Sequence, residues 1–400
     1  MMSDFNLCDK KILFVSNFSL NVLDSGAKIR ANGILKSLLR NNIVDMLYQY
    51  EKGNEEGSTN ALHKDGVRNV YAVQSVVSIF NTLLKSALSF RSYRSAKFYN
   101  RKFTQKFHDI CQDYDVIWIN FFDNAFNLSV YDKYIQSKVI VDLHNNDDEW
   151  YRRFIGSKKI KYIIFGVLNS MLFRRELNKV KTSSISFCHV SESDMQGFSK
   201  LSNAISNSKH FIIPNGIDSD LFLRSYKEHR DRLYDIGFVG SLSVSMNIDA
   251  AETLIQMAAG IRSAKPKIKI VLAGRSPSAS LCEKAKSSGV TIIEDPVDIY
   301  KIYNEIKILA MPFSMGSGSK LKLIEAAAMK CAILSSMTGL VGFDGEVNTH
   351  VIQYDNEDDF SLKAIELLDN KDRLKTITDR NFKFCRENYS WDNIFDGLNH

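Results

Sequence analysis

The chain has 400 residues and a net charge of +6, with 44% apolar and 24% charged residues. This composition is typical of a globular protein with enough apolar material for two domains, and it excludes disordered, collagen-like and coiled-coil chains. There is no run of eighteen apolar residues and no signal-peptide pattern, so we expect a cytoplasmic protein. The six cysteines form no CxxC pair, and we expect them to be reduced, with no metal site.

Short apolar runs alternate with helical patterns along the first half. Strands are expected at 11–15, 43–48, 70–73, 116–119, 139–143 and 185–190. Helical periodicity lies between them, notably at 27–40, 98–111 and 169–181. Such alternation predicts a parallel sheet with helices on both faces.

The second half repeats this rhythm. Its expected strands are 235–239, 268–273, 290–293, 308–311 and 332–335, its expected helices are 247–261, 280–286, 299–305 and 319–330, and the tail from 362 to 398 reads as helical. Residues 1–200 carry a net charge of +8 and residues 201–400 a net charge of −2, and all five prolines lie at or beyond residue 214. These shifts indicate two domains that meet near residue 210, each a doubly wound α/β domain.

Positive charge is concentrated in two stretches of the first half. Residues 85–106 hold seven lysines and arginines and no acid, and residues 152–181 hold nine against Glu176 alone. Basic residues mixed with apolar ones favour binding to an anionic membrane surface, and a solvated helical face explains them equally well. Nucleic acid is a third interpretation, but no nucleic-acid-binding motif accompanies the charge, so we expect no such partner.

The most specific signal is the segment from 311 to 329, where a strand is followed by a Gly/Ser loop and an Ala-rich helix. Glycines allow close approach of a ligand, and the amides and dipole of a helix N-terminus favour phosphate. Lys320 and Lys322 add positive charge in the first turn, where cations are otherwise unfavourable. Glu325 lies three residues after Lys322, and a carboxylate there could hold ribose hydroxyls. The alternative is a plain loop with solvated lysines and a Glu325–Lys322 pair.

Residues 316–326 resemble the donor motif of the family 4 retaining glycosyltransferases, in the form G-x-G-[ST]-[KR]-x-K-x-x-E-A. Eight further segments are similar to that family in the right order: 25–30, 139–145, 190–194, 213–218, 235–241, 247–250, 271–275 and 391–392. The resemblance implies the GT-B fold, two Rossmann-like doubly wound domains facing each other across a cleft. The implied parts are an acceptor-side domain at 1–212, a donor-side domain at 213–380, and a C-terminal helix at 381–400 that packs back on the first domain.

The resemblance also implies the roles of individual residues. His144 would be catalytic, near the donor sugar, although it could instead cap a turn. The donor diphosphate and sugar would meet Gly240, Ser241, Arg275, Ser317, Gly318, Ser319, Lys320, Leu321 and Lys322, and the ribose would meet Glu325. Gly26 and Arg30 would form an acceptor or sugar loop in which Arg30 reaches an anion, with a solvated Arg30 as the equal alternative.

Two departures from the family pattern stand out. Ser317 occupies the position of the usual first glutamate, which leaves the contact to the donor sugar open. Ser241 and, approximately, Asn247 replace a basic pair after the first strand of the second domain, and Lys320 and Lys322 are positioned to restore that charge.

The expected activity is metal-independent sugar transfer with retention from a nucleoside-diphosphate sugar, with UDP and GDP both open. A glycan or lipid-linked acceptor in cell-envelope polysaccharide synthesis is expected, at the inner face of the cytoplasmic membrane. No cofactor is expected besides this co-substrate. The alternatives are a sugar-nucleotide epimerase or a phosphorylase with the same two domains, and a catalytically silent nucleotide-binding or scaffold protein.

Overall fold

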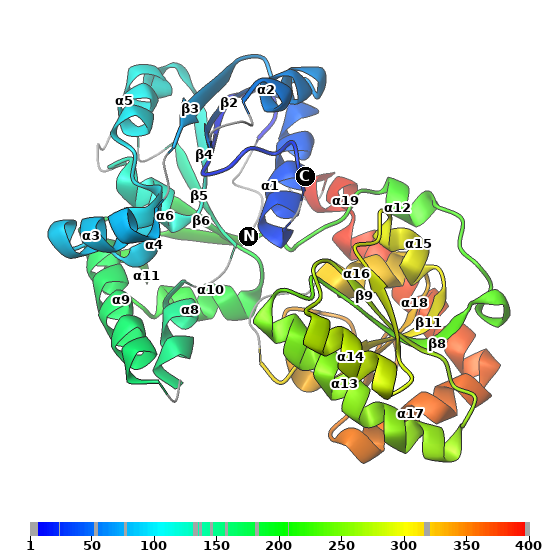
Figure 1. Ribbon diagram of the computed structural model, residues 1–400. Coiled ribbons are helices and arrows are strands. Elements are labelled where there is room, and N and C mark those ends of the chain that lie inside the picture. Colours follow the sequence, from blue (N-terminus) through cyan, green and yellow to red (C-terminus); the bar gives the residue numbers. More distant parts are fainter. Residues whose placement is uncertain are drawn as a thin grey trace. The chain divides into compact units, whose positions relative to one another are not determined.

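The computed structural model describes residues 7–23, 25–51, 55–75, 78–130, 135, 138–144, 147–156, 159–180, 184–206, 208–315 and 321–396. The chain forms two compact units (Figure 1). Unit 1 comprises Met1–Pro214 and Phe395–His400, and unit 2 comprises Asn215–Ile394. The boundary thus lies two residues beyond the predicted one. The chain returns to unit 1 only at Phe395, so most of the predicted closing segment 381–400 belongs to unit 2.

Unit 1 is built on a seven-stranded parallel sheet in the order β3-β2-β1-β4-β5-β6-β7. Its strands are β1 (Lys11–Ser16), β2 (Ile43–Tyr50), β3 (Val70–Gln74), β4 (Val116–Asn120), β5 (Val139–Leu143), β6 (Ser186–His189) and β7 (Lys209–Ile212). The predicted strands are confirmed within a few residues, because apolar runs of this length are buried on both faces of a parallel sheet. The short strand β7, KHFI, has no apolar run and was not predicted.

The helices of unit 1 cover both faces of this sheet. They are α1 (Gly26–Leu39), α2 (Glu55–Lys64), α3 (Ile79–Ser89), α4 (Tyr93–Phe98), α5 (Arg101–Ile110), α6 (Phe122–Asn127), α8 (Asp147–Arg153), α9 (Ile160–Lys179), α10 (Glu192–Ser199) and α11 (Asn203–Ser206). The β1-to-β2 connection runs toward β3, and the β3-to-β4 connection runs back across the sheet. Right-handed crossovers therefore place α1 and α5 on opposite faces, as Figure 1 shows.

Unit 2 has a six-stranded parallel sheet in the order β10-β9-β8-β11-β12-β13. The strands are β8 (Tyr234–Val239), β9 (Ile270–Gly274), β10 (Thr291–Glu294), β11 (Ile306–Met311), β12 (Ala332–Ser335) and β13 (Ile352–Gln353). Its helices are α12 (Asp220–Leu223), α13 (Ser245–Ala264), α14 (Ala279–Ser287), α15 (Ile299–Tyr303), α16 (Leu321–Ala328), α17 (Glu357–Asp369), α18 (Lys371–Tyr389) and α19 (Trp391–Asp396). The predicted helical tail is thus three separate helices, α17 to α19.

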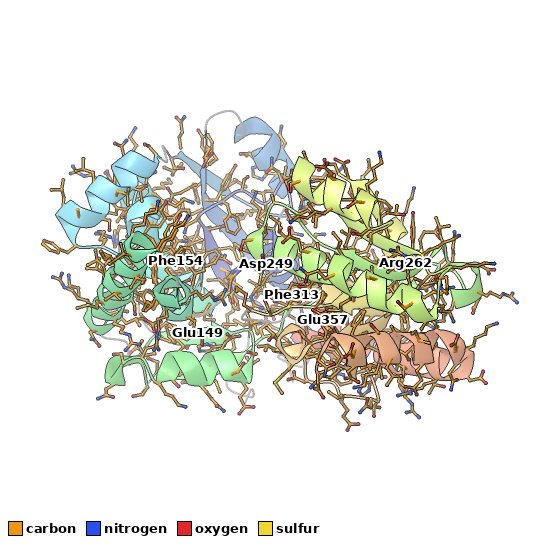
Figure 2. All side chains as sticks on the ribbon, turned by 60° about the horizontal axis from the view of Figure 1, so that its bottom comes forward. Glu149, Phe154, Asp249, Arg262, Phe313 and Glu357 are labelled. Carbon is orange, nitrogen blue, oxygen red and sulfur yellow. The ribbon has the colours of Figure 1, made fainter. Side chains whose placement is uncertain are left out.

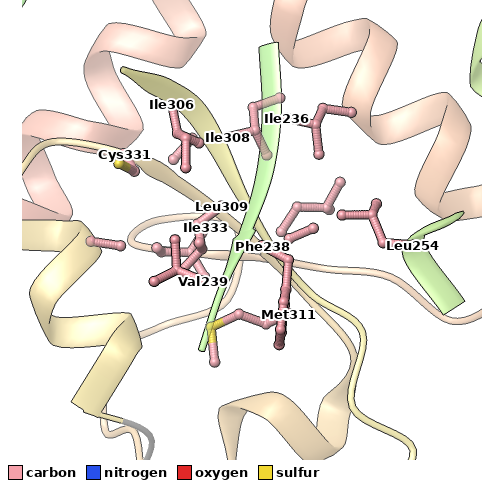
Figure 3. Packing of buried hydrophobic residues seen from close by; sticks show 14 of the residues in the cluster. Ile236, Phe238, Val239, Leu254, Ile306, Ile308, Leu309, Met311, Cys331 and Ile333 are labelled. Carbon is pink, nitrogen blue, oxygen red and sulfur yellow. The ribbon is translucent and has the colours of Figure 1, made fainter. Parts of the chain in front are cut away.

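The core of unit 2 lies between β8, β11, β12 and the helices that cover them (Figure 3). Ile236, Phe238 and Leu309 are fully buried there. The long helix α13 is anchored at its end by Arg262, which donates to the Gly289 carbonyl over 2.8 Å; Figure 2 labels Asp249 and Arg262 on this helix. A rigid sheet of this kind holds the loops at its carboxyl edge in fixed positions.

Candidate functional site

Two glycines stand where neighbouring strands of unit 2 end. Gly240 follows β8, Gly274 ends β9, and the Gly240 amide donates to the Ala273 carbonyl over 3.0 Å. A Cβ atom at Gly274 would lie 1.6 Å from the Gly240 carbonyl oxygen, and one at Gly240 would lie 2.9 Å from Lys322 Nζ. A side chain at Gly274 would collide with backbone, and one at Gly240 would displace the Lys322 ammonium. The carboxyl edge of this sheet therefore presents bare backbone, at the place where doubly wound sheets bind ligands.

The ammonium group of Lys322 lies beside Gly240. Lys322 is in the first turn of α16, and its Nζ donates to Asn247 Oδ1 over 2.8 Å. The same atom lies 4.7 Å from the ring centroids of both Phe238 and Phe313. Two aromatic faces and one amide oxygen attract and orient a cation. The cation sits at a helix N-terminus, so the helix dipole and the lysine both favour an anion at this point.

The other predicted donor residues are placed in different ways. Ser241 borders the lysine, because its carbonyl accepts from Asn247 Nδ2 over 2.9 Å. Arg275 directly follows Gly274 and is exposed. Leu321 packs its side chain on the core of unit 2, so it can serve a ligand only through its backbone. Ser317, Gly318, Ser319 and Lys320 lie outside the described residues.

Glu325 lies one turn deeper in α16. The Tyr303 hydroxyl donates to its Oε2 over 3.1 Å, and the Tyr300 hydroxyl donates to its Oε1 over 3.4 Å. Burial raises the pKa of the Glu325 carboxyl, while both tyrosines and the nearby charge of Lys322 act in the opposite direction. The two tyrosines hold the carboxylate in one orientation, and its role toward ribose stays a prediction.

Arg30 has a structural role that the sequence did not indicate. It was predicted to reach an anion from a loop, or else to be solvated, but it is 1% exposed on α1. Its Nη2 donates to Asp142 Oδ1 over 2.7 Å, and its Nη1 donates to the Ile213 carbonyl over 2.8 Å. The expectation for Arg30 was therefore wrong, because its charge is neutralised inside unit 1. Gly26, the other member of the predicted loop, is the exposed first residue of α1.

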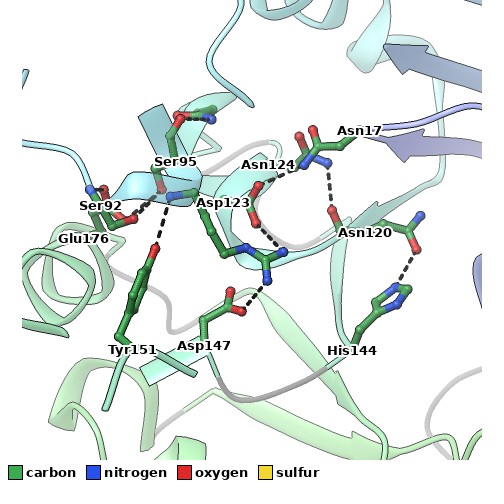
Figure 4. Close-up of polar contacts among 12 residues, drawn as sticks. Asn17, Ser92, Ser95, Asn120, Asp123, Asn124, His144, Asp147, Tyr151 and Glu176 are labelled. Carbon is green, nitrogen blue, oxygen red and sulfur yellow. Dashed lines mark hydrogen bonds and ion pairs between the residues drawn. The ribbon is translucent and has the colours of Figure 1, made fainter. Parts of the chain in front are cut away.

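His144 directly follows β5 and is buried. Its Nε2 lies 3.0 Å from Asn120 Oδ1 and 3.2 Å from Asp142 Oδ2. Burial lowers the pKa of the imidazole, so the ring is neutral near pH 7. Because Nε2 faces two acceptors, it carries the hydrogen, and Nδ1 carries the lone pair. Nδ1 is buried with no hydrogen-bond partner among the described residues (Figure 4).

The Phe121 ring packs against the face of the His144 imidazole. Its ring stacks on His144 with centroids 4.1 Å apart and planes inclined by 24°. Phe121 adopts a φ of 68°, which is unfavourable for a bulky side chain and is maintained only where the surrounding structure enforces it. Backbone strain of this kind is often found at functional sites, and here it positions the ring that holds His144.

A buried cluster of charged residues adjoins His144, and the sequence analysis missed it. Arg94 Nη1 lies 2.8 Å from Asp147 Oδ1, and its Nη2 lies 3.5 Å from Asp123 Oδ1. Asn17 donates to Asp123 Oδ2 over 2.9 Å (Figure 4). Burial, together with the neighbouring Asp123, raises the pKa of Asp147 to about 6. The same rule that selected His144 would have found Asn17, since it directly follows β1.

Among the described residues, no group of three or more His, Cys, Asp and Glu side chains is arranged to hold a metal ion. No described helix is both long and apolar enough to cross a membrane.

Comparison with known families identifies the unit that holds the glycines and Lys322. Residues 234–370, from the start of β8 to the residue before α18, match the family described as "Glycosyl transferases group 1". The match to this glycosyl transferase family thus covers most of unit 2. The resemblance seen in the sequence is thereby confirmed at the level of the family. No curated protein matches this sequence.

Several solved structures are similar to this chain over nearly its whole length. Anabaena HepE in complex with UDP-glucose has a TM-score of 0.67 at 14% identity and covers 97% of this chain and 98% of its own. Sucrose-phosphate synthase from Thermosynechococcus elongatus has a TM-score of 0.68 at 14% identity, with 97% of both chains covered. The α,α-trehalose 6-phosphate synthase of Burkholderia multivorans has a TM-score of 0.64 at 11% identity, again with 97% of both covered. These likenesses confirm the predicted GT-B fold.

Proposed function

We propose that this protein transfers a sugar from a nucleoside-diphosphate sugar to a glycan or lipid-linked acceptor, with retention at the anomeric carbon and without a metal ion. The observation that carries the proposal is the Lys322 ammonium, held beside the bare backbone of Gly240 at the N-terminus of α16. It provides positive charge beside backbone that carries no side chain, which suits a diphosphate. HepE, which shares this fold, was crystallised with UDP-glucose and with UDP.

In this proposal unit 2 holds the nucleotide. Lys322, the exposed Arg275 and the backbone at Gly240 and Ser241 bind the diphosphate, and Glu325 accepts hydrogen bonds from ribose. The departing diphosphate takes the acceptor proton, and the cations stabilise the charge that develops on it. No side chain is then required as a strong base. Ser317, in place of the family's glutamate, would offer the donor sugar a neutral contact.

Unit 1 supplies His144 and the acceptor side. The neutral imidazole of His144 presents the lone pair of Nδ1, which can accept a hydrogen bond from a sugar hydroxyl. Asn120 and Asp142 fix the tautomer through Nε2, and Phe121 fixes the plane of the ring. Substituting His144 with Ala should lower turnover more than nucleotide affinity, because the ring contacts the sugar in this proposal. Unchanged turnover would assign His144 a purely structural role.

An anionic membrane is the proposed location of the acceptor, at the inner face of the cytoplasmic membrane in envelope polysaccharide synthesis. The helix α9 buries one face, and its opposite face is apolar as well. Ile160, Ile164 and Met171 are 75%, 60% and 65% exposed, and Val167 and Leu168 lie beside them. On α3, Leu83, Leu84 and Leu88 are also exposed, and Arg175 of α9 covers the Phe90 ring at the end of α3 with a separation of 5.7 Å.

The charges around this apolar face favour anionic lipid. Arg152, Arg153, Lys159, Lys161 and Lys179 are exposed near it, and Glu176 on α9 is buried. Apolar side chains that enter the bilayer interface, flanked by lysine and arginine, are typical of peripheral membrane proteins. The double substitution Ile164→Glu and Leu168→Glu should abolish flotation with phosphatidylglycerol vesicles. Val297→Glu, at an exposed apolar residue of unit 2, is the matched control.

The first experiment is a thermal-shift panel of UDP, GDP, ADP, CMP and pyridoxal phosphate, each with and without EDTA. A ligand that binds the folded protein raises the midpoint by mass action. We expect one nucleoside diphosphate to stabilise the protein, with no effect of EDTA, and that nucleotide then identifies the donor class. The absence of a shift with every nucleotide would overturn the proposed donor site.

A catalytically silent nucleotide-binding protein is the second candidate, and Ser317 in place of the glutamate favours it. It predicts the same stabilisation by a nucleotide but no consumption of the matching sugar nucleotide. Release of nucleoside diphosphate from the donor, with or without acceptor, separates the two candidates.

A further inference from the structure

A groove beside β3 in unit 1 is lined by cations that the proposed function does not use. It has a volume of about 1030 Å³ and runs along β3, an edge strand of the sheet, between α3, α4 and α5. Its cationic lining residues are Lys85, Lys97, Arg101, Lys102 and Lys106, and no acidic residue is among the described residues that line it. All five belong to the basic stretch 85–106, and four of them follow Leu88, the last exposed leucine of α3. These cations line a concave site.

In the part of unit 1 that the structure describes, the positive charge of this groove is not paired with carboxylates. Residues 66–108 contain eight lysines and arginines and not a single acid. Among the described residues, no ion pair joins any of the five lining cations to a carboxylate. Like charges that share a groove repel one another, and the repulsion is relieved only by counterions or by an anionic ligand.

The remaining lining groups suit a polyhydroxylated ligand. Gln74 is exposed at the carboxyl end of β3, next to Ser75, and both line the groove. Gln49, Thr59 and Asn100 also line it, but Gln49 is 2% exposed and Asn100 caps α5 and donates to Gln49 Oε1 over 3.2 Å. Amide and hydroxyl side chains of this kind donate to and accept from sugar hydroxyls. The volume lies at the upper end of the range for small-ligand pockets, which leaves room for a chain of several sugar units.

The aromatic residues of the groove argue against single-stranded nucleic acid. Lys106 Nζ lies 4.5 Å from the centroid of the Tyr71 ring, and the Arg91 guanidinium lies 4.3 Å from that of Tyr99. Cations thus already cover a face of each ring, whereas single-strand binding proteins stack bases on open aromatic faces.

The groove is connected to the buried cluster near His144 by hydrogen bonds. Gln49 Nε2 in the groove wall donates to Asn17 Oδ1 over 3.3 Å, and Asn17 donates in turn to Asp123 over 2.9 Å. Both sites lie at the carboxyl edge of the same sheet. A chain held in the groove could therefore extend toward the strand ends that hold His144.

We propose that the groove beside β3 binds an acidic saccharide chain, one that carries carboxylate or phosphate groups along its length. Identifying this chain as the acceptor rests on the proposed transferase function, but the binding itself does not.

The test is fluorescence polarisation of a labelled oligogalacturonate with the full chain, in the absence of any nucleotide. We expect binding that weakens as salt is added, and at least tenfold weaker binding of the neutral galacto-oligosaccharide of the same length. The double variant Lys85→Gln and Lys102→Gln, with both lysines exposed, should raise the Kd for oligogalacturonate at least tenfold. Lys267→Gln with Lys286→Gln, at two exposed lysines of unit 2, is the control of equal charge and should leave the Kd unchanged.

Several outcomes would overturn the proposal. The first is equal binding of the neutral oligosaccharide, and the second is an unaltered Kd in the groove variant. The third is competition only by oligothymidylate, which would assign the groove to nucleic acid, or only by phosphatidylglycerol vesicles, which would assign it to lipid. Competition by inorganic phosphate at low millimolar concentration as strong as by the saccharide would reduce the site to one for a free anion. Lys322→Met should leave this Kd unchanged, so failure of the nucleotide site and failure of the groove are separable.

Discussion

The carboxyl edges of the two sheets are built in opposite ways. In unit 1 the edge is filled by buried polar side chains, and Arg30, Asp142 and His144 contact one another there. In unit 2 the described part of the edge is glycine backbone beside the ammonium group of Lys322. One topology thus supports two kinds of site.

The two edges can therefore recognise a ligand in different ways. Buried side chains that bond to one another are fixed in orientation, so an atom such as His144 Nδ1, which has no partner among the described residues, offers a directed contact. Bare backbone with a helix N-terminus offers charge complementarity and close approach, which suits a diphosphate. Substitutions at the two edges should therefore change stability and ligand binding to different extents.

The largest effect is expected from Arg30→Met in unit 1. The substitution leaves Asp142 buried without its cation, and breaking a buried pair costs about 3–5 kcal/mol. Urea unfolding measures the loss, and Arg30→Met with Asp142→Leu should recover part of it. The pair also holds the pKa of Asp142 well below its usual range. Its stabilisation is therefore present at neutral pH and is lost as the pH falls through the acid range. A cost under 1 kcal/mol would contradict the buried pair.

Glu176→Gln tests whether unit 1 buries a carboxyl that resists ionisation. The Glu176 oxygens accept from the Ser92 amide and from the Ser92 and Ser95 hydroxyls, and burial raises its pKa to about 7. The pKa of Glu176 is higher in the folded than in the unfolded protein, so its full contribution to the free energy of unfolding is present below about pH 4. That contribution falls by about 3 kcal/mol as the pH rises to about 7. Unfolding of the variant between pH 5 and 8 should lack this decline. Glu283→Gln, exposed on α14, should retain it.

Gly274→Ala tests the bare backbone of unit 2. The new Cβ would lie 1.6 Å from the Gly240 carbonyl oxygen, which is backbone and cannot rotate away. Overpacking of this kind costs about 1–3 kcal/mol, and the backbone shift should also weaken nucleotide binding. Thermal unfolding with and without the stabilising nucleotide measures both effects. Gly260→Ala, where the nearest atom would be a serine hydroxyl at 3.4 Å, is the control.

Lys322→Met should have the smallest effect on stability and a clear effect on ligand binding. Methionine keeps the apolar packing against Phe238 and Phe313 but removes the charge. A charge-assisted hydrogen bond contributes about 1.5–3 kcal/mol, so the Kd for the nucleoside diphosphate should rise at least tenfold. Isothermal titration calorimetry measures it, with Lys286→Met on the exposed face of α14 as the control. Undiminished affinity would remove Lys322 from the donor site.

Most of the fold was predictable, because the apolar runs of central parallel strands are buried on both faces and read clearly in the sequence. The edge strands were not: β7 and the two-residue β13 lack such runs. Of the predicted donor residues, Gly240, Ser241 and Lys322 lie together, since each directly follows a strand or begins a helix at one edge. Arg94 and Asp123 were missed, because their ion pair joins two helices, α4 and α6, that are separated in the sequence by α5 and β4.

The sequence by itself determined the alternation of strands and helices, the two-domain GT-B architecture and the glycine–lysine signal of unit 2. These are local patterns, set by neighbours a few residues apart. Only the tertiary structure decided that Arg30 is neutralised by Asp142, 112 residues away, and that the Ile160–Met171 side of α9 stays uncovered. Periodicity shows that a helix has apolar stripes, but the elements that pack against it decide which stripe is buried.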